Sequence, residues 1–135
     1  MRSAAGPRWR SLARVIGLGV DTVEVDRFRR VLARTPGLVA RVFTEDERRY
    51  AAQQQDPTER LAVRFAAKEA VMKVLGVGIG AIRLNDIEVI HTACGAPGLR
   101  LHGTAADLAA HRGVKQWWLS LTHTQLVATA VAAAE

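Results

Sequence analysis

"DPTERLAVRFAAKEAVMKVLG" (residues 56–76) decides the fold, because it predicts one long helix with clear signals at both ends. Asp56 suits the N-cap, Pro57 the first helical position and Glu59 the third, as in a capping box. Gly76 suits the position just beyond the last turn, where a left-handed backbone is common. We therefore expect a long central helix against which the other elements pack.

Two rows of side chains run along this predicted helix, and charges lie at the edge of the apolar one. The apolar row is Leu61, Phe65, Met72 and Leu75, and the row beside it is Ala62, Ala66, Glu69 and Lys73. Glu69 and Lys73 are four residues apart in the favourable order, so a surface ion pair contributing about 0.2–0.5 kcal/mol would explain them. However, the neighbouring alanines leave room for a ligand, and charges at the edge of a core need a partner or an ion.

A short apolar run, "VIGLGVD" (residues 15–21), predicts a buried strand that ends at a carboxylate. Because side chains alternate along a strand, Gly17, Gly19 and Asp21 share one face, which is nearly bare until its last residue. An aspartate at the end of a strand is most often a cap or turn residue. If Asp21 and Glu69 converge, however, the two carboxylates form a site suited to Mg²⁺.

Two lysines of the long helix, Lys68 and Lys73, would then face the phosphate groups of a substrate bound beside the metal. This arrangement is typical of phosphoryl transfer, in which positioning and charge neutralisation supply most of the catalysis. No Walker-type loop precedes the helix; the glycines of "GVGIG" (residues 76–80) follow it and predict a C-cap and a turn. His123, between two predicted strands, is by itself more typical of a core or turn histidine.

The rest of the sequence predicts an α+β fold without internal repeats or domain linkers. A helix is expected from about residue 23 to Pro36, and a shorter one after Thr44, which can form a capping box with Glu47. Further along, we expect strands over residues 87–91 and 99–102, a helix from Thr104 to Gly113 with Asp107 in a capping box, and a terminal antiparallel pair made of residues 117–123 and 126–132. The strands are therefore expected to be mostly antiparallel.

Composition limits the partners and the compartment. The 135 residues carry a formal charge of +6, which predicts attraction to nucleic acid, a phosphorylated ligand or an acidic protein. The single Cys94 forms no internal disulfide and no apolar run is long enough to cross a bilayer, so we expect a cytoplasmic protein. Residues 1–14 contain four arginines and no acid, which predicts a flexible basic arm before one domain over residues 15–135.

Three separated segments of the sequence together resemble one family. The segments are "GLGVDTVEVDRF" (17–28), "RFAAKEAVMKVLGVGIG" (64–80) and "LSLTHT" (119–124). They are similar to the signatures of holo-[acyl-carrier-protein] synthase, the short single-domain type of 4′-phosphopantetheinyl transferase. "RVFTEDE" (41–47) and "NDIEVI" (85–90) also match, so the resemblance covers about residues 15–133 in order.

This resemblance implies the α+β fold of the 4′-phosphopantetheinyl transferases and a defined reaction. The phosphopantetheine arm of coenzyme A would be transferred to a serine of apo acyl carrier protein, with Mg²⁺ as cofactor and adenosine 3′,5′-bisphosphate as the released product. The resemblance further implies a cytoplasmic homotrimer with active sites between subunits. It would serve fatty acid biosynthesis, with neither nucleic acid nor membrane as a partner.

The resemblance also implies roles for individual residues. Asp21 and Glu69 match the metal ligands and Lys73 matches the lysine on the coenzyme A phosphates, so these three are the expected catalytic residues. Further coenzyme contacts are implied for Arg64, Lys68, His123, Gly76, Gly78 and Gly80, and contact with the acidic carrier protein for Arg27. The group that takes the serine proton stays open between Glu69, Asp21 and a water on the metal.

Two other classes of protein stand as alternatives. A basic nucleic-acid-binding module would explain the charge, and it predicts salt-sensitive binding with no role for Glu69. An inactive relative that acts as an interaction subunit would lose Asp21, Glu69 or Lys73, all of which are present. The long basic arm and the bulky Trp117–Trp118 pair depart from the usual family pattern, and both fatty-acid and secondary-metabolism carrier proteins are compatible with it.

Overall fold

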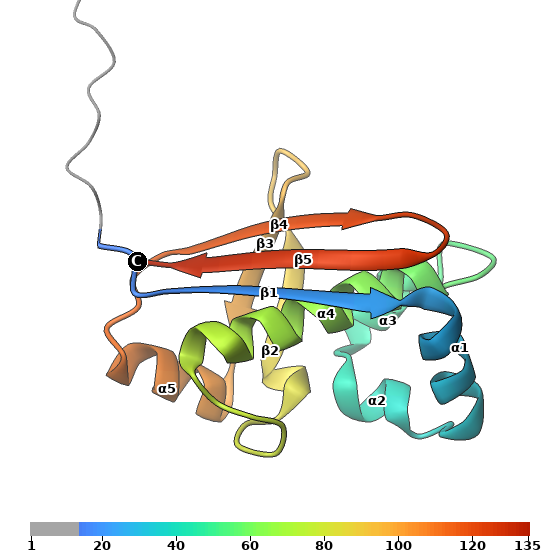
Figure 1. The fold of residues 1–135 in the computed structure, drawn as a ribbon, viewed down its shortest axis with the longest axis horizontal. Coiled ribbons are helices and arrows are strands. Elements are labelled where there is room, and N and C mark those ends of the chain that lie inside the picture. The colour runs from blue at the N-terminus through green and yellow to red at the C-terminus, as the bar shows by residue number, and fades with distance from the viewer. Residues whose placement is uncertain (1–13) are drawn as a thin grey trace, which may run out of the picture.

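The computed structural model describes residues 14–135, in which strands and short helices pack around one long helix (Figure 1). The helices are α1 (Val25–Arg34), α2 (Leu38–Val42), α3 (Glu45–Ala51), α4 (Thr58–Leu75) and α5 (Gly103–His111), and a 3₁₀ turn, η1, spans Leu84–Asp86. The strands are β1 (Gly17–Glu24), β2 (Ile87–His91), β3 (Pro97–Leu101), β4 (Trp117–His123) and β5 (Val127–Ala134). The predicted α+β class is confirmed.

Two antiparallel sheets contain all five of these strands. The larger sheet has the order β1-β5-β4, and its register pairs Gly17 with Ala134 and Glu24 with Val127. The smaller sheet is the β2–β3 hairpin. The predicted terminal pair and the predicted hairpin are both confirmed, and the chain returns at its end to place β5 beside its first strand (Figure 1).

Helix α4 is the centre of the fold and is buried on nearly all sides. Of its 18 residues, 13 are buried. β1 and β5 pack on it along much of its length, and α1, α3, β2 and β4 also contact it. The expected division into one apolar row and one charged edge is therefore too simple, because several elements cover different sides of the helix.

The ends of α4 carry the predicted signals. The Asp56 carboxylate accepts hydrogen bonds from the backbone nitrogen of Thr58 at 3.0 Å and from its hydroxyl at 2.6 Å. These bonds, assisted by Arg29, lower the pKa of Asp56 to about 2. Pro57 already has helical dihedral angles, and Gly76 ends the helix with a φ of 68°. Asp56 thus binds the first turn of the helix, but Pro57 occupies the N-cap position, and the predicted capping box with Glu59 does not form.

The bare face of β1 lets this strand lie directly against α4. A Cβ atom on Gly19 would lie 2.0 Å from the carbonyl oxygen of Ala70, and one on Gly17 would lie 2.9 Å from that of Val74. No side chain fits at either distance, so glycine is required for the close approach. The strand then continues past Asp21 to Glu24, further than predicted, and holds Asp21 over the helix. The expectation of a buried strand is wrong, because the other face of β1 exposes Leu18 and Val20.

Two local expectations differ from the structure. Helix α2 was not expected; it has only five residues and no side-chain cap, so it leaves little signal in the sequence. Helix α5 begins at Gly103, and no side chain caps its first turn. The expected capping box of Thr104 and Asp107 is therefore wrong, because Thr104 already lies inside the helix.

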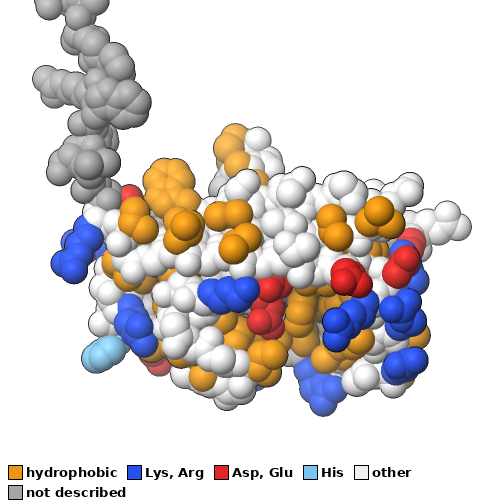
Figure 2. Space-filling view, in the orientation of Figure 1, with side chains coloured by type: hydrophobic (Ala, Val, Ile, Leu, Met, Phe, Trp, Pro, Cys, Tyr) orange, Lys and Arg blue, Asp and Glu red, His pale blue; other side chains and the backbone are white. Residues whose placement is uncertain are grey.

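The outer face of the larger sheet is apolar and exposed. Leu18 and Val20 of β1, Trp118 of β4 and Val131 of β5 lie on this face by their register, and all four are exposed. Figure 2 shows hydrophobic side chains along these strands. Trp117 points the other way and packs against the core, which confirms the predicted split of the tryptophan pair. We call this face the apolar sheet face.

No helix within residues 14–135 is long and apolar enough to cross a membrane. The expected basic arm over residues 1–14 lies outside the described residues except for Arg14.

Candidate active site

Strand β1 and helix α4 bring together the three residues expected to be catalytic. The ammonium of Lys73 donates a hydrogen bond to the carbonyl of Val20 at 2.7 Å and lies 3.3 Å from the Asp21 carboxylate. Glu69 is one helical turn before Lys73 and close enough to Asp21 for their charges to repel. Local spacing and the glycine face of β1 together produce this juxtaposition.

Glu69 is left without a full set of partners. Its Oε1 atom is shielded from solvent and has no hydrogen-bond partner among the described residues. Burial and the negative charge of Asp21 raise the pKa of the Glu69 carboxyl, and Lys73 opposes this shift only in part. A half-buried carboxylate with one shielded, unpaired oxygen, close to a second carboxylate, fits a divalent cation, because Mg²⁺ binds one or two protein carboxylates and fills its other positions with water and phosphate oxygens.

A cavity of about 570 Å³ opens beside these carboxylates. We call it the carboxylate cavity, because Asp21 and Glu69 line it together with apolar residues of α1, α2, α4 and the loop after α4, chiefly Phe28, Val31, Leu38, Val42, Phe65 and Ile79. Arg27 lines the same cavity. Hydrophobic side chains lie between acidic and basic ones below the strands in Figure 2. The cavity therefore combines a cation-binding edge with an apolar wall.

Lys68 lies on another side of α4 and does not reach this cavity. Its side chain is fully buried and its ammonium lies 2.8 Å from the Glu47 carboxylate. It also donates to the carbonyls of Leu84 and Ile87. Burial lowers the pKa of Lys68, and Glu47 opposes the shift. The expected contact between Lys68 and coenzyme is therefore corrected, because all three of its protons are already used inside the protein.

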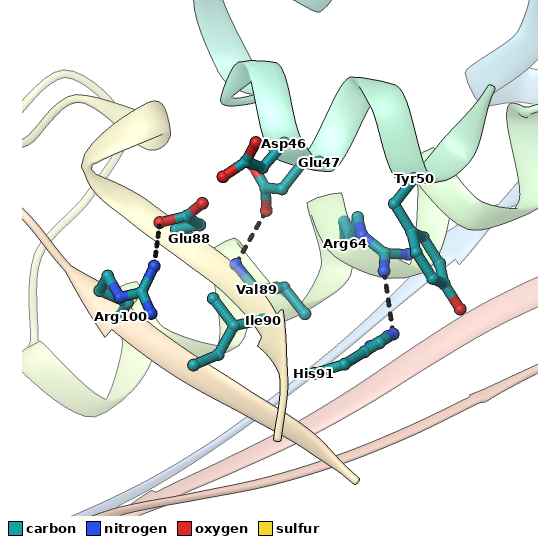
Figure 3. A pocket seen from close by; sticks show the side chains of 9 residues that line it. All are labelled: Asp46, Glu47, Tyr50, Arg64, Glu88, Val89, Ile90, His91 and Arg100. Carbon is teal, nitrogen blue, oxygen red and sulfur yellow. Dashed lines mark hydrogen bonds and ion pairs between the residues drawn. The ribbon is translucent and has the colours of Figure 1, made fainter. Parts of the chain in front are cut away.

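Arg64 lines a second cavity of about 310 Å³, which shares no lining residue with the first (Figure 3). We call it the arginine cavity. The guanidinium of Arg64 lies 4.3 Å from the centre of the Tyr50 ring and 3.4 Å from the ring nitrogen of His91. Arg64 is only 3% exposed, its Nε atom has no partner, and burial lowers its pKa. A buried guanidinium without a carboxylate in contact is suited to an anionic ligand.

The remaining expected site residues lie at the ends of α4 and β4. His123 approaches the Glu59 carboxylate at 3.2 Å, and both side chains are partly exposed. After α4, Gly76 and Gly80 have positive φ angles, and no atom lies near a Cβ added to Gly78 or Gly80. This loop presents Ile79, which is 77% exposed, to the carboxylate cavity.

Sequence reasoning missed several residues that line the arginine cavity. Glu47 was expected only as part of the Thr44 capping box, which is confirmed, and its pairing with Lys68 was not foreseen. Tyr50 and His91 come from α3 and β2, and no spacing in the sequence links them to Arg64. One signal could have indicated a buried partner for Lys68, because this charged residue lies within a run of apolar helix positions.

An α+β fold that presents a strand carboxylate to a carboxylate and a lysine on a central helix defines a site suited to a cation and a phosphorylated ligand. A model of the 4′-phosphopantetheinyl transferase superfamily matches residues 17–131, and the chain belongs to this superfamily. Its relatives place it among the holo-[acyl-carrier-protein] synthases, which are enzymes. The family suggested by the sequence is thus confirmed.

Similar proteins match nearly the whole chain. The sequence is 52% identical over 121 residues to the holo-[acyl-carrier-protein] synthase of Frankia casuarinae, covering 90% of this chain and 98% of that protein. The crystal structure of the Neisseria meningitidis enzyme has a TM-score of 0.81 at 31% identity and covers 90% and 99% of the two chains. The Bacillus anthracis enzyme, solved in complex with CoA (3′,5′-ADP), has a TM-score of 0.74 at 32% identity and covers 90% and 97%.

Proposed function

We propose that this enzyme transfers the 4′-phosphopantetheine group of coenzyme A to a serine of apo acyl carrier protein, with Mg²⁺, and releases adenosine 3′,5′-bisphosphate. The observation that carries the proposal is the half-buried Glu69 carboxylate near Asp21, whose shielded Oε1 atom has no partner among the described residues, in a chain that belongs to this superfamily. A relative solved with CoA supports coenzyme A as the donor.

The chain's own residues would bind and orient the reacting groups. Asp21 and Glu69 would hold Mg²⁺, which when bound supplies positive charge for the pyrophosphate of coenzyme A. The serine oxygen attacks the β-phosphorus and a new P–O bond forms, while the bond from that phosphorus to the 3′,5′-bisphosphate breaks. The serine O–H bond breaks as well, and its proton passes to Glu69, to Asp21 or to water. Lys73 is half-exposed and lies beside Asp21, so its ammonium is placed to stabilise the negative charge on the leaving oxygen.

A homotrimer would bring the two cavities into one site. Within one subunit the carboxylate cavity and the arginine cavity share no residue. The apolar sheet face offers an exposed surface of the kind that marks protein interfaces. We propose that it packs against neighbouring subunits, so that Arg64 and His123 of one subunit bind coenzyme A held by Asp21, Glu69 and Lys73 of the next. The Gly76, Gly78 and Gly80 loop would close on the coenzyme.

Arg27 would engage the acidic carrier protein. Its side chain is exposed and lines the carboxylate cavity beside apolar groups. A cation next to an apolar wall suits a partner that presents acidic and hydrophobic side chains together, because charge steers the encounter and burial stabilises it. We place the reaction in the cytoplasm and in fatty acid biosynthesis.

Intact mass spectrometry tests the proposed transfer. Apo acyl carrier protein is incubated with the enzyme, coenzyme A and Mg²⁺, and we expect a mass increase equal to one phosphopantetheine group on the carrier protein. The same reaction with chelator in place of Mg²⁺, or with a carrier protein whose serine is replaced by alanine, should give no increase. If none of several carrier proteins gains this mass, the proposed function is wrong.

The proposed assembly has its own test. Size-exclusion chromatography with light scattering should give three times the 14.7 kDa chain mass. Val20→Glu places a charge on the apolar sheet face and should give monomers with little transfer activity, because the shared site is then incomplete. A wild-type enzyme that is monomeric and fully active would overturn the assembly but not the transfer reaction.

A further inference from the structure

A pair of buried charges lies beside α4, and neither of its members has a role in the proposed transfer. Lys68 of α4 and Glu47 of α3 have fully buried side chains, and 2.8 Å separates their charged atoms. Neither residue lines the carboxylate cavity. We refer to these two residues as the Glu47–Lys68 pair.

Every polar atom of the pair has a partner. The Oε2 atom of Glu47, which bonds Lys68, also accepts from the backbone nitrogen of Thr44 at 2.9 Å. The Oε1 atom accepts from the backbone nitrogen of Val89 at 2.9 Å. Lys68 donates its remaining protons to the carbonyls of Leu84, at 3.1 Å, and Ile87. The pair therefore ties together α3, α4, η1 and β2 through fully used hydrogen bonds.

Stability alone is a weak reason for such a pair. The cost of removing two charges from water offsets most of their attraction, and apolar residues of similar size often stabilise a core as well or better. A buried ion pair does, however, fix one geometry, because its hydrogen bonds have definite directions. The question is which part of the molecule this geometry fixes.

The pair holds the segment that returns from the glycine loop. Leu84, whose carbonyl binds Lys68, and Ile79, in the loop itself, both line the carboxylate cavity beside Glu69. The loop around Ile79 has an internal turn, in which the backbone nitrogen of Ala81 donates to the carbonyl of Gly78. Lys68 thus anchors to the central helix the far end of a glycine-containing loop that forms one wall of the site.

We propose that Lys68 is a positioning residue, which together with Glu47 fixes the segment over residues 76–86 so that Ile79 and Leu84 form the wall of the carboxylate cavity. This inference rests on the proposed function, in which the glycine loop closes on coenzyme A. Lys68 itself touches no substrate. Its loss should weaken coenzyme binding through the loop and leave the chemical step largely intact.

Lys68→Met tests the inference, with Leu119→Ala as the control. Leu119 packs against the core from β4 and is not among the hydrogen-bond partners of Glu47 or Lys68, so it reports the effect of general destabilisation. In Lys68→Met we expect amide hydrogen exchange over residues 76–86 to become at least about tenfold faster, with β5 unchanged. The KM for coenzyme A should rise roughly tenfold, while kcat changes by less than about threefold.

Two results would overturn the inference. One is exchange over residues 76–86 that matches the control; the other is a loss of kcat at unchanged KM. If Lys68→Met does not fold, Glu47→Gln, which keeps the side-chain shape and the acceptor for Val89, is measured in the same way and must show the same selective loosening. If the wild-type enzyme transfers nothing, the proposed function fails, and the exchange data alone then decide whether the pair positions the loop.

Discussion

Lys68 and Glu69 are neighbours in α4, and their side chains lie in opposite environments. Lys68 is completely buried, and a carboxylate and two carbonyls satisfy its ammonium. Glu69 faces the carboxylate cavity with one oxygen unpaired and with Asp21 repelling it. A satisfied buried charge indicates a structural or positioning role, whereas an unsatisfied one indicates a missing ligand. The comparison therefore separates residues that hold the site from those that perform the reaction.

The largest effect on activity is expected from replacing Glu69, whose carboxylate lacks a partner. Glu69→Ala should abolish transfer, a drop of at least about a thousandfold, which corresponds to about 4 kcal/mol of transition-state stabilisation. The melting temperature should stay the same or rise, because the substitution removes a carboxylate that burial and Asp21 disfavour. Transfer assays and thermal melts of the same sample check both parts. Substantial activity of this variant in Mg²⁺ would contradict the assignment of Glu69.

Replacing Lys68, whose charge is fully paired, is expected to lower stability. Lys68→Met leaves the Glu47 charge buried without its partner, so the free energy of unfolding should fall by about 3 kcal/mol or more. Denaturant unfolding measures this loss. An unchanged midpoint and slope would show that the buried pair contributes nothing to stability and would remove the contrast between the two neighbours.

The close contact between β1 and α4 positions Asp21 beside Glu69. Gly19→Ala would place a Cβ atom 2.0 Å from the carbonyl of Ala70, so the strand must move and carry Asp21 with it. We expect a loss of about 1–3 kcal/mol in stability and a larger relative loss of activity. Gly37→Ala is the matched control, because nothing lies within 4 Å of its added Cβ and its φ of −75° suits alanine. Equal behaviour of the two variants would contradict this view of the interface.

Local signals predicted the elements but not every contact between them. Asp56, Thr44 and Gly76 mark helix ends within a few residues, so α3 and α4 could be predicted. The pairing of β1 with β5 joins the two ends of the domain, and no local pattern specifies it.

The sequence predicted only part of the candidate site, because contacts between elements leave no local signal. Glu69 and Lys73 share a helix, and Asp21 ends a recognisable glycine-containing run, so these three could be proposed from spacing and resemblance. The resemblance implies a coenzyme contact for Lys68 as well. Only tertiary structure shows that its partner is Glu47 rather than a phosphate, because the direction of its side chain depends on what packs around α4.

A pH dependence distinguishes Glu69 from the other carboxylates. Burial and Asp21 raise its pKa above the ordinary value of 4.5 in the absence of metal. The folded protein then binds this proton more tightly than the unfolded chain, so the associated stability is fully present below about pH 4.5 and is lost as the pH rises through the raised pKa. In chelator, the melting temperature of wild type relative to Glu69→Gln should fall across this window. A constant difference would contradict the raised pKa.

The smallest effect is expected for an exposed ion pair. Arg49 of α3 contacts Glu45 and Asp46, and all three side chains are largely exposed. Water and salt screen such pairs, so Arg49→Ala should change the free energy of unfolding by less than about 0.5 kcal/mol. Measured beside Lys68→Met in denaturant, it shows how much more a buried charge pair contributes to stability than exposed pairs within one helix. A loss as large as that of Lys68→Met would contradict this distinction.

The claim that Asp21 and Glu69 bind a divalent cation is tested most directly by calorimetric titration of Mg²⁺ at saturating coenzyme A. We expect wild type to bind one Mg²⁺ per chain, and Glu69→Gln, which preserves shape and fold, to bind it at least roughly tenfold more weakly. Arg49→Ala should bind it as wild type does. Equal Mg²⁺ affinity of wild type and Glu69→Gln would contradict the assignment of this site.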